Sequence, residues 1–204
     1  MRSYLKRIVT LLAISLSAVT GSLFLGTTAK GQSADQAVMR EGDVQVPITI
    51  SRGHDTDPRD HGRPVILVAA ALGVPADVFR ATFRNVSPAP SGHEPDPAQV
   101  NLNKQALLRG LGPYGVTNDR LDTVSDYYRY NGSRGELWRN RRAVAFATVK
   151  DGKIVRITIT NPGAGYSSVP ILTLPGMSTV KLKVALLFGT DLSKNGSLKS
   201  ITAE

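Results

Sequence analysis

The chain has 204 residues, a formal net charge of +9 and no cysteine. The lack of cysteine excludes disulfide bonds, thiolate metal sites and thiol nucleophiles, so the fold must rest on a packed apolar core. Residues 1–34 hold four basic and no acidic side chains, which leaves a net charge of 9 − 4 = +5 for the remainder. That charge is ordinary for a soluble domain and implies mild attraction to anionic surfaces.

Residues 1–34 have the layout of a secretory signal peptide. Three basic residues precede the apolar stretch 8–19, and small residues follow it, with cleavage expected after Ala29 or Ala34. Counted on to Leu25, the stretch reaches eighteen residues, close to the lower limit for a membrane span, so a retained N-terminal anchor is the alternative. We therefore expect an exported protein of the periplasm, cell envelope or extracellular space, tethered to a membrane only if the segment stays uncleaved.

Residues 35–51 are predicted to form a polar linker followed by an edge strand. Between Val44 and Ile50, apolar and polar residues alternate, which indicates a strand with one buried face. Pro47 cannot donate a hydrogen bond to a neighbouring strand, and this favours a position at the edge of a sheet.

Residues 52–130 are predicted to form a helical domain. Proline, aspartate and threonine at the expected starts, and glycine at the expected ends, are typical of helix termini. The predicted helices cover residues 64–72, 75–83, 97–109 and 117–128. Four helices in this order predict two helical hairpins.

Residues 131–142 are predicted to be an arginine-rich and aromatic connector, and residues 143–204 an antiparallel β module. Asp151-Gly152 lies between two alternating runs and indicates a two-residue hairpin turn. We expect one apolar face of cross-strand pairs: Val144 with Ile159, Phe146 with Ile157, and Thr148 with Val155. The predicted class is thus α+β, an N-terminal pair of helical hairpins followed by a small antiparallel β module.

The run N-P-G-A-G-Y-S-S-V-P at residues 161–170 resembles a β module of extracellular bacterial and phage proteins. The similarity covers about residues 143–174, and the preceding part, with G-H-D-T-D-P-R-D and S-D-Y-Y-R-Y, is similar to uncharacterised exported bacterial proteins. The resemblance implies location and fold but no activity. Gly163, Gly165 and Tyr166 are expected to form a structural turn, because the third glycine and the helix of a dinucleotide-binding motif are missing.

Histidine and acidic residues gather in two loops of the pattern H-[DE]-x-D-P. Imidazole and carboxylate groups together suit a divalent metal or general acid–base chemistry. The site predicted on this basis consists of His54, Asp57, His93 and Asp96. The alternative is that each Asp-Pro pair caps a helix, because aspartate followed by proline is a helix-start signal.

The connector and the end of the last predicted helix combine arginines with aromatic residues. Such a surface can bind an anionic glycan or a nucleic acid through ion pairs and stacking. The predicted binding residues are Tyr128, Arg129, Tyr130, Trp138, Arg139, Arg141 and Arg142. The alternative is a docking segment, with the aromatic rings packed between the helical and β parts while the arginines stay solvated.

We expect a non-catalytic envelope or extracellular interaction protein of unknown ligand, with no cofactor. One alternative is a hydrolase that uses the two histidine–aspartate loops, with or without a divalent metal. The other is the anionic-glycan or nucleic-acid binder at residues 127–142. The partner is unknown beyond an anionic surface or glycan.

Overall fold

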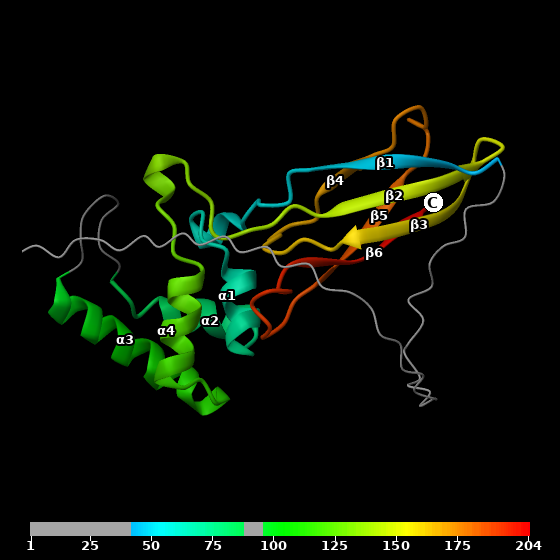
Figure 1. The fold of residues 1–204 in the computed structure, drawn as a ribbon. Helices are drawn as coiled ribbons and strands as arrows, with labels where there is room; N and C mark the ends of the chain where they lie inside the picture. The colour runs from blue at the N-terminus through cyan, green and yellow to red at the C-terminus, as the bar shows by residue number, and fades with distance from the viewer. Residues whose placement is uncertain (1–41, 88–95) are drawn as a thin grey trace, which may run out of the picture. The chain divides into compact units, whose positions relative to one another are not determined.

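Four α-helices and six β-strands form the mixed α+β fold of residues 42–87 and 96–204, the part of the chain that the computed structural model describes (Figure 1). The helices are α1 (Val65–Leu72), α2 (Ala76–Phe83), α3 (Pro97–Leu111) and α4 (Asn118–Tyr127). The strands are β1 (Val44–Ser51), β2 (Val144–Lys150), β3 (Lys153–Asn161), β4 (Ile171–Thr173), β5 (Leu182–Leu187) and β6 (Ser197–Ala203). Short 3-10 helices are η1 (Pro58–Asp60), η2 (Gly112–Tyr114) and η3 (Gly132–Arg134).

Local signals set the ends of the helices. α1 ends at Gly73, which adopts a left-handed φ of 74°, and its N–H donates to the carbonyls of Ala69 and Ala70. The side chain of Asp96 accepts from Ala98 N at the start of α3, and Thr117 does the same for Arg120 N before α4. All four helices begin and end within two residues of the predicted positions.

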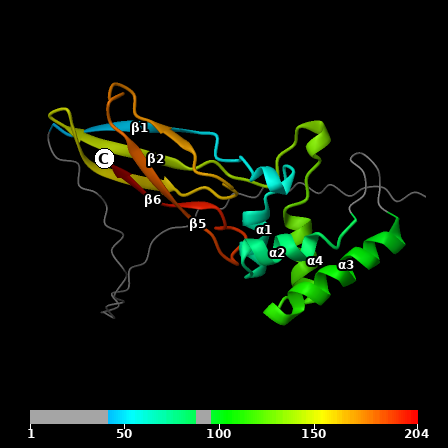
Figure 2. The ribbon, with the colours of Figure 1, turned by 180° about the vertical axis from the view of Figure 1, so that it is seen from behind.

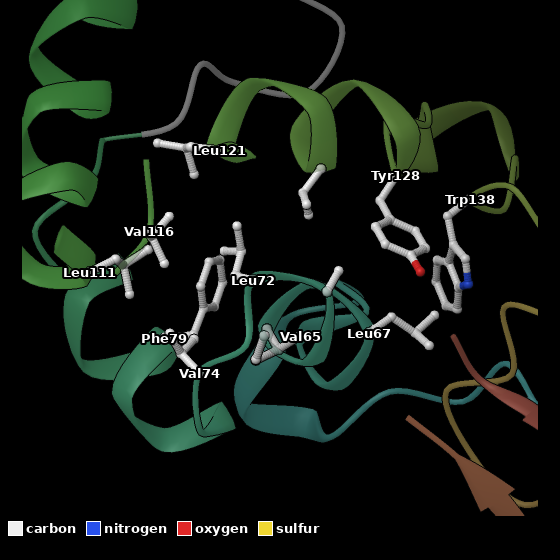
Figure 3. Close-up of a cluster of buried hydrophobic side chains, with 13 residues drawn as sticks. Val65, Leu67, Leu72, Val74, Phe79, Leu111, Val116, Leu121, Tyr128 and Trp138 are labelled. Carbon is white, nitrogen blue, oxygen red and sulfur yellow. The ribbon is translucent and has the colours of Figure 1, made fainter. Parts of the chain in front are cut away.

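The helices share one apolar core. α2 packs against α1 and α3, and α4 packs against α1. Figure 3 shows Leu121 and Tyr128 from the α4 segment facing Val65 and Phe79 from α1 and α2. Within the described ranges, no single helix is long and apolar enough to span a membrane. Taken together, α1 and α2 meet the same criteria of length and composition, but the pair is bent by 105° between the two helices.

Strand β1 lies inside the larger sheet, whose order is β3-β2-β1-β4 and whose neighbours are antiparallel. The prediction of an edge strand was therefore wrong. β4 pairs only with Thr49–Ser51, whereas β2 pairs with residues 44–48. Pro47 is thus in the part of β1 that has one partner strand, where a residue without an N–H can be accommodated.

The β2–β3 hairpin turns at Asp151-Gly152 as predicted, but its register differs. Bulges near Thr148 and Val144 each add one residue on β3, so that Ala147 pairs with Ile157 and Ala145 with Ile159. A slip of one residue exchanges the two faces of a strand. The buried face of β2 therefore carries the two alanines, which are 0% and 1% exposed, and not the predicted Val144 and Phe146.

The antiparallel pair β5–β6 completes a second core with the four-stranded sheet. β6 packs against β3, and β5 packs against β4. Figure 2 shows β5 and β6 lying over the larger sheet. The buried members of this core include Ile48, Tyr166, Leu174 and Leu198, which come from separate parts of the chain.

Hydrogen bonds join the helical and β segments within a single compact unit, Met39–Glu204. Asn195 Nδ2 donates to the Leu67 carbonyl at 2.7 Å and to the Tyr128 hydroxyl at 2.8 Å. Trp138 Nε1 donates to the Gly165 carbonyl at 2.8 Å. We call Leu67, Tyr128, Trp138, Gly165 and Asn195 the junction, and it places the predicted ranges 52–130 and 143–204 in one unit.

Candidate ligand-binding site

Asp57 is engaged by its neighbours. Its carboxylate accepts from Arg59 N and caps η1, and it accepts again from the Arg59 guanidinium at 2.7–3.1 Å. These hydrogen bonds and the nearby charge of Arg59 hold the pKa of Asp57 well below its ordinary value. Asp57 thus stays ionised and acts as a helix cap.

The other members of the predicted metal site do not gather around Asp57. Asp96 caps α3 through Ala98 N at 2.9 Å, and His93 lies outside the described residues. No group of three or more His, Asp or Glu side chains suited to holding a metal ion occurs in residues 42–87 and 96–204. The capping alternative accounts for both aspartates.

His54 lies against aromatic rings. Its ring stacks on Tyr166 with centroids 5.2 Å apart, and the Trp138 ring is 6.1 Å away. Burial lowers the pKa of His54, while the adjacent charge of Asp55 opposes that effect. Nε2 is buried and has no hydrogen-bond partner among the described residues. We therefore assign His54 to the packing around the junction.

The aromatic residues of the predicted connector site are structural. Tyr128 is 4% and Trp138 is 2% exposed, and both belong to the helical core. Burial raises the pKa of Tyr128 to about 12. The Tyr130 hydroxyl donates to the Gly62 carbonyl at 2.8 Å, and its ring meets Trp138 edge-on. These contacts match the docking alternative.

The arginines of that site have separate partners. Arg129 pairs with Asp126, and the Arg139 guanidinium lies 4.8 Å from the centre of the Tyr127 ring. Arg141 donates to the carbonyls of Gly163 and Ser193, and Arg142 is exposed. Arg141 consequently fixes loops of the β part.

Gly163, Gly165 and Tyr166 form a structural turn, as the sequence motif predicted. Both glycines have positive φ, and a Cβ on Gly163 would lie 2.6 Å from the Arg141 carbonyl oxygen. The Tyr166 hydroxyl accepts from Ala143 N at 2.9 Å. The close approach of two backbone segments explains why glycine is needed here.

A cleft of about 520 Å³ lies where the η1 loop meets α2. We call it the arginine cleft. Four arginines contribute to its lining: Arg59, Arg63, Arg80 and Arg84. Its acidic members are Asp60 and Asp77, and Asp60 is only 4% exposed. The cleft is a concave site of ordinary size for a small ligand.

Arg80 binds both acids of the cleft. Its Nε and Nη2 bind the two carboxylate oxygens of Asp60 at 2.7 and 2.8 Å, and its Nη1 binds Asp77 at 2.9 Å. This bidentate pairing raises the pKa of Arg80. Since a buried carboxylate needs such a partner, the Asp60–Arg80 pair is structural, and it ties the η1 loop to α2.

Arg63 and Arg84 supply the available positive charge. No carboxylate of the described residues forms an ion pair with either side chain. The Arg63 guanidinium lies over the Phe83 ring, 4.8 Å from its centre, and Arg84 follows at the end of α2. A cation stacked on an aromatic ring keeps its outer donors available to an anion.

The sequence did not predict the arginine cleft. Arg80 and Arg84 are four residues apart at the end of α2, but Arg63 precedes α1, and nothing in the sequence joins it to the other two; α1 and α2 are bent by 105°, and all three arginines line one cleft. The helix-start signals around residues 57–64 and 75 were visible. The angle between the helices, which brings the arginines together, was not.

Comparisons of the chain with protein-family models, with curated proteins and with solved structures found no match.

Proposed function

We propose that this is an exported, non-catalytic binding protein that takes an anionic ligand in the arginine cleft. The observation that carries the proposal is the pair Arg63 and Arg84, which line the cleft without a carboxylate partner among the described residues. Planar guanidinium groups bind carboxylates and phosphates through charge-assisted hydrogen bonds. The lining holds four arginines and two aspartates, so the cleft keeps a surplus of positive charge.

The non-catalytic assignment is supported by the roles of the acid–base residues proposed from sequence. Asp57 and Asp96 each accept hydrogen bonds at the start of their own helix, and His54 stacks in the aromatic packing near the junction. A general acid or base needs free reach to a substrate proton. Binding in the cleft requires none of these three side chains to act.

Export, with a bacterial origin, is proposed from the layout of residues 1–34 and from the resemblance of residues 143–174 to modules of extracellular bacterial and phage proteins. We also propose the finer arrangement of two helical hairpins. It is supported by the packing of α1 on α2 and by the Lys104–Asp122 ion pair at 2.7 Å between α3 and α4.

Nuclear magnetic resonance with acetate and inorganic phosphate as probes tests the proposed function. Saturable shifts are expected at the backbone amides of Arg63, Phe83 and Arg84. They should be lost in the double variant Arg63→Gln/Arg84→Gln and kept in the control Arg134→Gln/Arg142→Gln, whose arginines are exposed outside the cleft. Shifts that persist in the first variant, or that occur only elsewhere, would overturn the proposal.

A further inference from the structure

A second, apolar cavity lies directly beside the arginine cleft. Its volume is about 240 Å³, and its walls come from all four helices, through side chains such as Val68, Phe79, Leu107 and Leu121. An apolar cavity of roughly 150 Å³ already accommodates a benzene molecule. The space in the helical core is therefore large enough for a sizeable hydrocarbon group.

The cleft and the cavity have a common boundary. Arg63, Val65 and Phe83 line both of them. The Arg63 guanidinium over the Phe83 ring thus sits at the point where the charged and the apolar spaces meet. A ligand that bridges this boundary would place a negative charge at Arg63 and apolar atoms on the inner side.

The polar groups in the cavity wall are largely engaged within the protein. The Tyr128 hydroxyl accepts from Asn195 Nδ2, and the Tyr130 hydroxyl donates to the Gly62 carbonyl. Ser125 is at an exposed position of α4. Because the inner wall presents mainly apolar surface, it favours hydrocarbon over a sugar or a peptide.

We propose that the ligand is a free single-chain amphiphile with a carboxylate head, a medium-chain fatty acid in chemical class. Its carboxylate binds Arg63 and Arg84 in the cleft, and its alkyl chain enters the apolar cavity. This inference rests on the proposed anion site and adds the tail. Charge complementarity at the mouth and the shared lining residues select this occupant.

Calorimetric titration of the full-length chain with acetate, octanoate and octan-1-ol separates the head from the tail. Each methylene buried in the cavity adds roughly fourfold to affinity, so octanoate is expected to bind at least about a hundredfold more tightly than acetate. Octan-1-ol keeps the chain and loses the charge, and it should bind at least about tenfold more weakly than octanoate.

Two variants test the two spaces separately. Arg63→Gln/Arg84→Gln should weaken the binding of octanoate by about tenfold or more and should weaken the binding of octan-1-ol by less. Ser125 lines the cavity from an exposed position of α4, so Ser125→Trp adds a bulky ring to the cavity wall and should abolish the gain in affinity of octanoate over acetate. The controls are Arg134→Gln/Arg142→Gln and Ser178→Trp, all at exposed positions outside both spaces. Circular dichroism of each variant verifies that it is folded.

The outcomes distinguish this inference from the proposed function. If acetate and octanoate bind equally and both depend on the arginines, the anion site is supported, and binding of an alkyl chain in the cavity is contradicted. If octanoate and octan-1-ol bind equally in the wild type and in the double arginine variant, the carboxylate does not bind the arginines and the inference is overturned, while the shifts with acetate and phosphate decide the anion site. Octanoate affinity that is unchanged by Ser125→Trp also overturns the inference.

Discussion

Replacing Asn195 by alanine should destabilise the protein more than any surface substitution. Asn195 is 1% exposed, and its side chain makes three hydrogen bonds. Nδ2 donates to the Leu67 carbonyl and the Tyr128 hydroxyl, and Oδ1 accepts from Gly189 N at 3.1 Å. One truncation therefore removes hydrogen bonds to α1, to the end of α4 and to the backbone next to β5.

The magnitude follows from the number of hydrogen bonds lost. A buried donor or acceptor that loses its partner costs about 1–3 kcal/mol. Water admitted to the space of the lost amide can satisfy part of the set, so we expect Asn195→Ala to lower the free energy of unfolding by about 3 kcal/mol. Tyr128→Phe removes a single bond and should cost about 1 kcal/mol.

Urea denaturation followed by circular dichroism measures these changes. The control is Asn85→Ala, at an exposed position, which should stay within about 0.5 kcal/mol of the wild type. The double variant Asn195→Ala/Tyr128→Phe should show a coupling of about 1 kcal/mol, since both changes remove the same bond. Strict additivity, or a cost of Asn195→Ala equal to that of Asn85→Ala, would refute the role assigned to the junction.

Three further predictions concern stability. Burial lowers the pKa of His54 below its ordinary value of 6.5, so the unfolded chain binds a proton at this residue more readily than the folded chain does. The free energy of unfolding should therefore fall as the pH drops below 6.5. The variant His54→Phe should reduce this dependence on pH in urea titrations across that range. An unchanged slope in His54→Phe would contradict the assignment. Gly165→Ala would place a Cβ 2.7 Å from a carbonyl oxygen at a φ of +82°, and it should lower the free energy of unfolding by more than about 2 kcal/mol. Gly135 also has a positive φ but has open space around it, so Gly135→Ala should lower the free energy by about 1 kcal/mol. Equal melting temperatures of the two variants would contradict this prediction. Asp60→Ala removes the buried bidentate partner of Arg80 and should lower the free energy of unfolding, measured by urea denaturation, by about 3 kcal/mol. A decrease of less than about 0.5 kcal/mol would contradict the structural role of this pair.

Features with a local cause were the ones that could be predicted from sequence. The starts of α3 and α4 follow Asp96 and Thr117, and the end of α1 precedes Gly73, because capping acts within one turn of the chain. The Asp151-Gly152 turn is local for the same reason. Such signals operate without knowledge of the tertiary fold.

Features that depend on distant segments were not predictable in the same way. The register of β2 against β3 changes at two bulges, and the buried face then carries Ala145 and Ala147, whose small side chains gave a weaker pattern than Val144 and Phe146. β1 is interior because β4, more than 100 residues later, pairs with its last residues. Both outcomes depend on which segments pack on which.

The candidate site shows the same division. The alternative of helix capping could be formulated from sequence, and the structure places Asp57 and Asp96 at helix starts. The arginine cleft could not be predicted from sequence, because Arg63 and Arg84 lie on either side of a bend between two helices. A pattern search finds periodic or contiguous residues, and these residues are neither.

A crystal structure of the chain with octanoate would show directly whether the arginine cleft and the apolar cavity bind one ligand. We expect the carboxylate at the Arg63 and Arg84 guanidinium groups and the alkyl chain in the cavity lined by Phe79, Leu107 and Leu121. Octanoate bound elsewhere, or an empty cavity at saturating octanoate, would contradict it.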